Sequence, residues 1–411
     1  MGTYRFSAIQ YIKSVPRYLF VRAFGQRWPG LATGALSCIR RTDLLPPMLP
    51  SPAWTRIRTR LSGVCGSDLA TIRAKGSPYF SPMTSCPFVF GHETVGEIAA
   101  IGEEMQGFAI GDRVVIEPAL CCPVRGIEPM CVPCRQGAYG NCENVMKGDL
   151  APGIQTGYCR DTGGGWSPEF VAHPFQLHRV PDTLSDEEAV LIEPFACCLH
   201  AALRASPTDG DTVLVLGCGS IGLLTIAALR AIGSRCRVLA VARYPHQQAF
   251  ARALGADVVL TGRALYEAVC EETGASSHRP EIGRPTFIGG VHVTFDCVGN
   301  DRTLDDALRL TGTQGAVVVV GMPGIPSGID WTAVWYKELS VLGAYAYGTE
   351  TFENQNVRTF ELAIRLMERY GARLKPLVTH LFSLSDYRKA LFHALTAGPS
   401  GAVKVAFDFR Q

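Results

Sequence analysis

The segment that decides the fold runs from Val213 to Gly222 and reads VLVLGCGSIG. Its four apolar residues lead into Gly217-x-Gly219-x-x-Gly222, and LLTIAALRAIG then continues at helical spacing. A buried strand, a tight glycine turn and a helix N-terminus together seat a dinucleotide pyrophosphate. The alternative is a strand–turn–helix unit without a ligand, but the strand and helix context favours the dinucleotide. The predicted cofactor contacts are Gly217, Gly219, Ser220, Ile221 and Gly222.

Strands and helices continue to alternate after this motif. Apolar strands are expected at 211–217, 236–242, 256–260, 291–299, 315–321 and 339–347. Helical patterns lie between them at 221–233, 246–255, 264–274 and 302–312, and we expect an exposed loop at 276–290. Such alternation predicts a doubly wound parallel sheet. The tail, with a helix at 360–371 and a strand-like run at 402–409, is expected to return to the first domain.

Composition narrows the class of protein. The 411 residues include 39 Lys and Arg against 37 Asp and Glu, so no nucleic-acid partner is expected. No apolar run approaches the roughly 20 residues of a membrane span, so no membrane partner is expected either. Basic residues without acidic ones precede Asp43, as in a transit peptide, but there is no small-residue cleavage signal. The 15 cysteines cluster tightly, which favours metal ligation in the reducing cytoplasm over disulfides.

The first 60 residues are expected to form an irregular β-rich region, followed by a half-buried strand at 55–64. Next come GVCGSD (63–68) and GHETVGE (91–97), which place Cys65 and His92 beside glycine turns. A catalytic zinc needs three protein ligands and an open position. Glu193 is the predicted third ligand, with Glu93 as an alternative or exchanging one. Taken singly, a cysteine or histidine is more often a core residue; beside a nucleotide turn, metal binding is favoured.

A second set of cysteines has the spacing of a structural metal site. Cys131-x2-Cys134-x7-Cys142 follows Cys121 and Cys122 in a lobe rich in Gly and Pro, at about 121–142. Four thiolates close a zinc site tetrahedrally and leave no position for substrate. We expect Cys122 to be the fourth ligand, with Cys121 as its competitor. Buried thiols without metal are the alternative interpretation.

These motifs, in this order, resemble those of the zinc-dependent medium-chain alcohol dehydrogenases, in particular the polyol, glucose and threonine dehydrogenase branch. The resemblance covers about 50–411, and the first 50 residues more loosely. It implies a GroES-like β-barrel catalytic domain built from 1–192 and 346–411, with a Rossmann domain at 193–345. It also implies hydride transfer between an alcohol and NAD(P) through a zinc-bound alkoxide. A zinc-free enone or quinone reductase, or a non-catalytic nucleotide-binding relative, would leave the predicted ligands unexplained.

The resemblance also implies roles for single residues. Cys65, His92 and Glu193 would bind the catalytic zinc, and Glu93 would enter its coordination shell. Asp68 would hydrogen-bond the second nitrogen of His92, and Ser67 would bond the alcohol oxygen and pass its proton outward. Two positions depart from the family pattern. Ala70 stands where a proton-relay histidine is common, and eight residues separate Cys122 from Cys131 instead of two.

Cofactor preference is predicted from the end of the second strand, where an NAD enzyme carries Asp or Glu. Here Ala242 and Arg243 stand there, with His246 nearby. A guanidinium can pair with a 2′-phosphate, so NADP is predicted over NAD. If Arg243 only stacks on adenine, both cofactors would serve. We further expect two zinc ions per chain, a homodimer or homotetramer, and a substrate pocket lined by Tyr79, Phe80 and Trp166.

Overall fold

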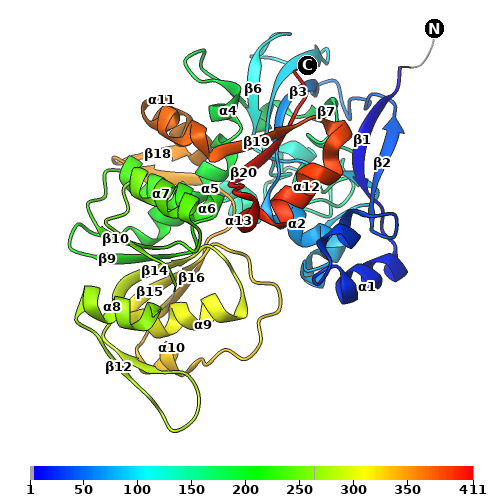
Figure 1. The fold of residues 1–411 in the computed structure, drawn as a ribbon. Helices are drawn as coiled ribbons and strands as arrows, with labels where there is room; N and C mark the ends of the chain where they lie inside the picture. Colours follow the sequence, from blue (N-terminus) through cyan, green and yellow to red (C-terminus); the bar gives the residue numbers. More distant parts are fainter. Residues whose placement is uncertain (1–3, 263, 411) are drawn as a thin grey trace. The chain divides into compact units, whose positions relative to one another are not determined.

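The computed structural model describes residues 4–262 and 264–410, and the chain divides into two compact units (Figure 1). The first unit comprises Met1–Glu193 and Tyr347–Gln411, and the second comprises Pro194–Ala346. The carboxyl-terminal segment therefore belongs to the same unit as the amino-terminal half.

The second unit is built on a six-stranded sheet in the order β11-β10-β9-β14-β15-β16, and every neighbouring pair is parallel. Numbered within the unit, this is the order 3-2-1-4-5-6 of a doubly wound dinucleotide fold, which confirms the predicted fold class. The strands are β9 (Thr212–Leu216), β10 (Arg237–Val241), β11 (Val258–Leu260), β14 (Val291–Asp296), β15 (Thr311–Val319) and β16 (Ser340–Gly343). The helices that follow them are α6 (Ser220–Ala231), α7 (Pro245–Ala253), α8 (Leu265–Thr273), α9 (Asp301–Leu310) and α10 (Thr332–Tyr336).

The expected loop at 276–290 is instead a β-hairpin. Its strands β12 (Ser276–His278) and β13 (Thr286–Ile288) pair antiparallel. Phe287 is buried in the core of this unit and packs edge-on against Tyr266, with ring centroids 5.8 Å apart. One buried aromatic residue anchors a segment whose other side chains are mostly polar, which explains why its composition suggested a loop.

The first unit contains a seven-stranded sheet centred on β3 (Thr55–Gly63), which confirms the strand predicted there. β3 pairs antiparallel with β5 (Thr94–Ile101), β7 (Glu169–Ala172) and the carboxyl-terminal β20 (Lys404–Asp408). The remaining strands are β6 (Arg113–Ile116), β8 (Leu177–Arg179) and β19 (Val378–Phe382). Because Ala406 is paired with Gly63, β20 brings the end of the chain beside the segment that leads into Cys65.

A smaller sheet in the order β2-β1-β4 completes the first unit. β1 (Phe6–Tyr11) and β2 (Ile39–Leu44) pair along their whole lengths, and β4 (Phe88–Val89) joins β1. Residues 12–38, hereafter the β1–β2 insertion, connect the two strands and contain α1 (Val15–Phe24) and the 3-10 helix η1 (Pro29–Thr33). The sequence analysis missed α1, whose proline in the first turn is compatible with a helix start.

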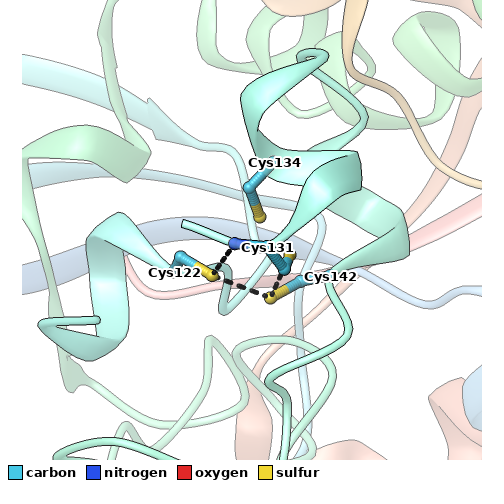
Figure 2. Close-up of side chains that lie close together, drawn as sticks. All are labelled: Cys122, Cys131, Cys134 and Cys142. Atoms are coloured by element: carbon cyan, nitrogen blue, oxygen red, sulfur yellow. Dashed lines mark hydrogen bonds between the residues drawn. The ribbon is translucent and has the colours of Figure 1, made fainter. Parts of the chain in front are cut away.

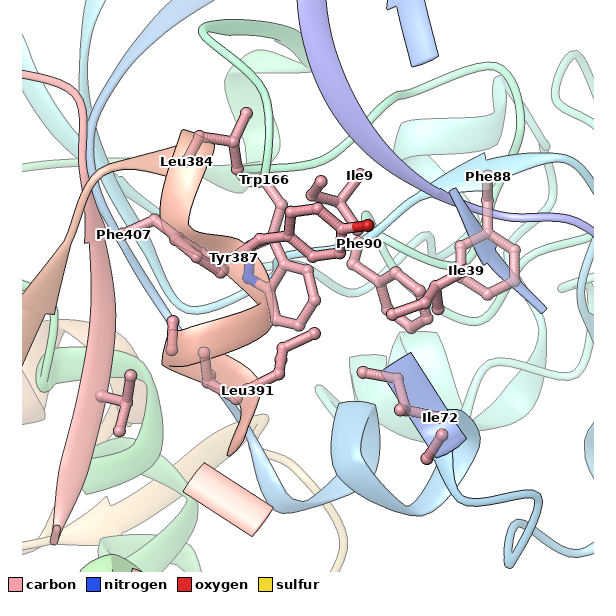
Figure 3. Close-up of a cluster of buried hydrophobic side chains, with 14 of the residues drawn as sticks. Ile9, Ile39, Ile72, Phe88, Phe90, Trp166, Leu384, Tyr387, Leu391 and Phe407 are labelled. Carbon is pink, nitrogen blue, oxygen red and sulfur yellow. The ribbon is translucent and has the colours of Figure 1, made fainter. Parts of the chain in front are cut away.

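The β1–β2 insertion is anchored in the main core of the first unit. Val21 and Ala32 are buried in one cluster with Ile9 and Ile39 of the flanking strands, and with residues from α12 and β20. Figure 3 shows this cluster, in which Phe88, Phe90 and Trp166 bring together strands and loops far apart in sequence. The insertion is therefore part of the folded unit.

The other elements support the sites described next. They include α2 (Gly66–Ile72), η2 (Pro78–Met83), η3 (Pro123–Arg125), α3 (Val132–Arg135), η4 (Tyr139–Asn141), η5 (Pro174–Gln176), α4 (Asp186–Ala189), α5 (Ile192–Ala205), the hairpin β17 (Thr349–Phe352) and β18 (Gln355–Arg358), α11 (Thr359–Leu374), η6 (Lys375–Leu377), η7 (Leu384–Asp386), α12 (Tyr387–Leu395) and α13 (Ala397–Ser400). None of the described helices is both long and apolar enough to cross a membrane.

Candidate metal and dinucleotide sites

The structure places Cys65, Asp68 and His92 together at the start of α2. Cys65 is the N-cap of this helix, and its backbone N–H donates to Asp68 Oδ2 over 3.1 Å. The other oxygen, Asp68 Oδ1, lies 3.5 Å from His92 Nδ1. Asp68 and His92 are both buried. Asp68 therefore faces the histidine ring nitrogen for which the family resemblance proposed it as partner.

The charged groups around His92 favour a protonated or metal-bound imidazole. Burial acts to lower the pKa of His92, but the charges of Asp68, Cys65 and Glu193, together with a hydrogen bond with Cys65, outweigh burial and raise that pKa well above its ordinary value. Cys65 lies within hydrogen-bonding reach of the same ring. Ser67 Oγ lies 3.5 Å from His92 Nε2. The Asp68 carboxylate therefore lies on the Nδ1 side of the His92 ring. The Cys65 thiol and the Ser67 hydroxyl also lie next to this ring, where they can contact the same ligand as the histidine.

Two buried glutamates lie in the same region of the first unit. Glu193, in the first turn of α5, is close enough to His92 and Glu93 to feel both charges, and it hydrogen-bonds Tyr347. Burial raises the pKa of Glu193 to about 7. A thiol, an imidazole and a poorly solvated carboxyl group make a donor set that zinc prefers. Cys65, His92 and Glu193 therefore fit a zinc ion by their chemistry.

Glu93 has a partner that the sequence analysis did not identify. Lys404 Nζ on β20 lies 2.6 Å from both carboxylate oxygens of Glu93. Each side chain is only 1% exposed, so the ion pair is fully buried. Burial acts to lower the pKa of Lys404, but the Glu93 carboxylate outweighs it and raises that pKa. A lone lysine in the otherwise apolar run AVKVAFDF was the available signal, because a buried lysine needs a partner.

The four cysteines of the predicted structural site converge in one place (Figure 2). The sulfur atoms of Cys122, Cys131, Cys134 and Cys142 all lie within 4.8 Å of one another. Cys142 Sγ lies 3.7 Å from Cys122 Sγ and 3.9 Å from Cys131 Sγ. Four thiols at this separation fit a tetrahedral zinc ion. The group contains Cys122 rather than Cys121, whose side chain instead hydrogen-bonds Cys134.

Hydrogen bonds around these cysteines favour a thiolate at Cys131, whereas burial raises the pKa of Cys122 and Cys142. Asn144 donates from its backbone to Cys142 Sγ over 3.4 Å and from its side chain to Cys122 Sγ over 3.3 Å. Burial acts to raise the pKa of Cys131, but hydrogen bonds from the backbone at Glu143 and Cys134 outweigh it and lower that pKa to about 7. N–H donors aimed at sulfur stabilise the charged form that binds metal.

Arg125 holds the lobe around these cysteines. Its guanidinium is completely buried and donates to five backbone carbonyls at 2.7–3.2 Å. They belong to Leu120, Lys147, Leu150, Ala151 and Gly153. Burial lowers the pKa of Arg125, and no fixed acidic group bonds it in the described hydrogen bonds. A lobe with few helices and strands thus obtains its shape from one cation and, by our interpretation, one metal ion.

In the second unit, the glycines have the conformations that a phosphate turn requires. Gly217 has φ of +88°, and a Cβ there would lie 2.2 Å from Val298. A Cβ on Gly222 would lie 1.8 Å from the Gly217 carbonyl oxygen, so only glycine permits this contact between turn and helix. Nothing lies within 4 Å of a Cβ on Gly219, the N-cap of α6. The first backbone N–H groups of α6, from Ser220 and Ile221 on, fit a pyrophosphate.

The end of β10 carries no acidic residue. Ala242 is buried and donates its N–H to the Leu260 carbonyl, whereas Arg243 is exposed. The Arg243 guanidinium lies 5.5 Å from the centre of the Tyr244 ring, and Tyr244 stacks on His246. His246 Nε2 is buried and has no hydrogen-bond partner in the described part of the chain. These groups can accept an anionic ligand at the strand end.

The predicted substrate-pocket residues have different outcomes. Trp166 was wrongly assigned, because it is completely buried, donates from Nε1 to the Gly63 carbonyl over 3.1 Å, and packs against Phe90 and Phe407. It fills the core of the first unit instead. Tyr79 and Phe80 are exposed on η2. The sequence analysis also missed Tyr158, which donates to Asp68 Oδ1 over 3.2 Å.

Comparisons with known proteins match both parts of this fold. Residues 51–182 match the alcohol dehydrogenase GroES-like domain, and residues 220–361 match the zinc-binding dehydrogenase domain. The chain is 30% identical over 373 residues to L-idonate 5-dehydrogenase of Vitis vinifera, covering 90% of this chain and 92% of that protein. It is 31% identical over 373 residues to sorbitol dehydrogenase of Arabidopsis thaliana, covering 90% and 93%. The crystal structure of 2R,3R-butanediol dehydrogenase from Bacillus subtilis superposes with a TM-score of 0.72 at 27% identity, covering 98% and 99%.

The fold, with its nucleotide turn and metal-type donors, defines an oxidoreductase that binds a nicotinamide dinucleotide. The chain belongs to the zinc-dependent medium-chain alcohol dehydrogenase family. Members of this family transfer a hydride between an alcohol and NAD(P), which confirms the reaction class predicted from the motifs.

Proposed function

We propose that this protein oxidises a polyol or another secondary alcohol, binds two zinc ions per chain and prefers NADP. The observation that carries the proposal is that the half-buried Cys65 and the buried Glu193 both act on the buried His92, with Asp68 behind the histidine. A zinc-free reductase has no use for this donor set. The names of the relatives support the substrate class, because L-idonate, sorbitol and butanediol each carry secondary hydroxyl groups.

Zinc bound at this site would supply Lewis-acid chemistry that makes an alcohol hydroxyl acidic at neutral pH. Cys65, His92 and Glu193 would hold the metal, with Glu93 as an exchanging ligand. Ser67, which is partly exposed beside His92, would relay the alcohol proton, taking it up at Oγ while releasing its own hydroxyl proton to solvent. This role suits a site in which Ala70 replaces the usual histidine.

Tyr158 is a poor alternative to Ser67 as proton acceptor. The Tyr158 hydroxyl is buried, so it has no direct path along which to pass a proton to solvent, whereas Ser67 is partly exposed. That hydroxyl donates to Asp68 over 3.2 Å and lies 3.2 Å from Thr71 Oγ1. We therefore assign Tyr158 and Thr71 to orienting Asp68, and through it His92.

The zinc count separates the two metal sites. Elemental analysis should find two zinc ions in the purified protein and one in Cys65→Ala, which should keep its fold but lose turnover. Cys134→Ala should lose the other ion and chiefly cost stability, because closed zinc sites contribute folding free energy. One zinc ion or none in the wild type would overturn this part of the proposal.

Substitutions at Glu193 test its role as third ligand. Glu193→Ala should weaken the catalytic zinc and reduce turnover, whereas Glu193→Cys should retain metal because thiolate is a good zinc donor. Full activity in Glu193→Ala would assign the carboxylate ligand to Glu93 alone. Turnover of a panel of polyols, sugars and simple alcohols, followed by absorbance of the reduced nicotinamide, identifies the substrate.

Cofactor preference rests on Arg243. An exposed guanidinium past a strand end without a carboxylate can pair with the 2′-phosphate of NADP. Arg243→Ala should lower kcat/KM for NADP by roughly 10-fold or more, about 1.4 kcal/mol, while sparing NAD. Arg235, which is exposed before the start of β10 and therefore at the other end of the strand, offers a matched control in Arg235→Ala. Equal preference for both cofactors in the wild type would reduce Arg243 to a surface residue.

A further inference from the structure

The β1–β2 insertion exposes large apolar side chains although it is firmly anchored. Val15, Leu19, Phe24, Trp28 and Leu36 are 46–63% exposed. A connection of 27 residues between two strands that pair along their whole lengths is far longer than pairing requires. Long ordered connections of this kind are commonly functional.

The exposed side chains form an outward face on α1. Val15, Leu19 and Ala23 follow one another at four-residue steps and are all exposed. Such residues share one side of a helix, and here that side lies opposite Val21, which is buried in the core. At the helix end, Phe24 packs between Phe20 and Trp28, with ring centroids 5.4 and 6.4 Å apart. The inward side of α1 builds the core, and among the described residues nothing covers its outward side.

The same segment is strongly basic. Residues 12–38 contain Lys13, Arg17, Arg22 and Arg27 and no acidic residue, whereas the whole chain has a net charge of +2. Lys13, Arg22 and Arg27 are exposed. The described residues form no salt bridge with these four cations: Arg22 donates to the Tyr18 hydroxyl, over 3.2 Å. The outward face therefore combines aromatic and aliphatic side chains with uncompensated positive charge.

Exposed apolar side chains beside uncompensated positive charge are suited to binding an anionic membrane. They are less suited to binding a second copy of this chain. Interfacial helices carry Trp, Phe and Leu beside Lys and Arg, and they bind by apolar burial together with attraction to anionic lipids. A twofold contact between two copies would place the same basic patch against itself. Like charges facing each other across an interface oppose association, and the insertion has no carboxylate to pair with them.

We propose that the β1–β2 insertion is a docking surface for anionic lipid membranes. Val15 and Leu19 on the outward side of α1 would face the acyl chains, Phe24 and Trp28 would enter the headgroup region at and after the end of the helix, and Arg22 and Arg27 would lie beside the lipid phosphates. The expected absence of a membrane partner rested on the lack of a spanning run, and surface docking requires none. The proposal is independent of the proposed substrate and cofactor, since it uses none of the catalytic residues.

The experiment is sedimentation of the full-length, zinc-loaded protein with vesicles. Binding is expected to vesicles of phosphatidylcholine with phosphatidylglycerol, to be weak with phosphatidylcholine alone, and to fall steeply from 50 to about 500 mM NaCl. Arg22→Gln/Arg27→Gln should lower the partition coefficient about 25-fold, at about 5-fold per cation. Leu19→Ser/Phe24→Ser should lower it at least about 10-fold.

Matched controls alter similar side chains elsewhere in the first unit. Arg365→Gln/Arg369→Gln removes two exposed arginines of α11, and Ile110→Ser removes an exposed apolar residue. Both should bind vesicles as the wild type does. Thermal melting verifies that every variant folds. Equal binding by wild type and insertion variants, or no binding to anionic vesicles, would overturn the proposal. So would dissociation of an oligomer by Leu19→Ser/Phe24→Ser without vesicle binding, which would assign the face to a second copy.

Discussion

Replacing Lys404 by methionine tests the buried ion pair that Lys404 forms with Glu93, next to the proposed zinc ligand His92. The substitution keeps the length of the side chain and removes its charge, which leaves the Glu93 carboxylate buried without its partner. At 2.6 Å and an effective dielectric constant of about 20, the gross attraction is about 6 kcal/mol. Desolvation offsets part of this attraction, and removal of one partner of a buried pair costs about 3–5 kcal/mol.

The zinc-depleted protein should therefore lose about 3–5 kcal/mol in Lys404→Met, seen as a fall in Tm of roughly 6–10 °C for a unit of this size. The double variant Lys404→Met/Glu93→Gln should recover most of that loss, because an uncharged amide tolerates burial better than an unpaired carboxylate. Thermal melting by circular dichroism, with the wild type and Glu93→Gln completing the cycle, gives the coupling between the two residues.

A second measurement tests whether Glu93 becomes a zinc ligand when Lys404 is replaced. In that case Lys404→Met should release catalytic zinc to a chelator more slowly than the wild type, and zinc should restore more stability to the variant. Wild-type melting of zinc-depleted Lys404→Met, with no recovery in the double variant, would refute the reasoning. That result would mean that the Lys404–Glu93 ion pair makes no net contribution to the free energy of unfolding.

Three further predictions concern the first unit. Gly63→Ala should displace Glu93, because a Cβ there would lie 2.1 Å from Glu93 Oε2, and should lower both Tm and zinc affinity. Arg125→Met should unfold the cysteine lobe locally and speed zinc loss, with Arg125→Lys intermediate, as followed by proteolysis and thiol titration. Protonation of His173 should lower the free energy of unfolding as the pH falls from 6.5 toward 4. Burial lowers the pKa of His173 to about 4 in the folded state, so the unfolded chain takes up the proton first. His173→Asn, which keeps an acceptor for the Phe175 N–H, should weaken that acid destabilisation by about 2 kcal/mol in urea unfolding at pH 4.

Local patterns carried most of what the sequence predicted. The glycine turn after β9, the strand β3 and the clustered cysteines each depend on residues close together in the chain, so spacing identifies them. The helix α1 and the hairpin β12–β13 were missed because single buried residues, Val21 and Phe287, anchor segments of otherwise unremarkable pattern. Long-range pairing was equally invisible, since Lys404 and Glu93 are 311 residues apart.

The Lys404 contact bears on the question that the sequence left open between the two glutamates. Both oxygens of Glu93 are engaged by Lys404, so any approach of Glu93 to a metal must break a buried ion pair. Glu193 bonds the neutral Tyr347 hydroxyl, and burial raises its pKa to about 7, so a dication beside it would relieve an unfavourable buried charge. We infer that Glu193 is the resident ligand and that Lys404 sets the free energy at which Glu93 exchanges with it. Weakening the lysine contact should then shift ligation toward Glu93, whereas removing Glu193 should make Lys404 the main obstacle to zinc binding.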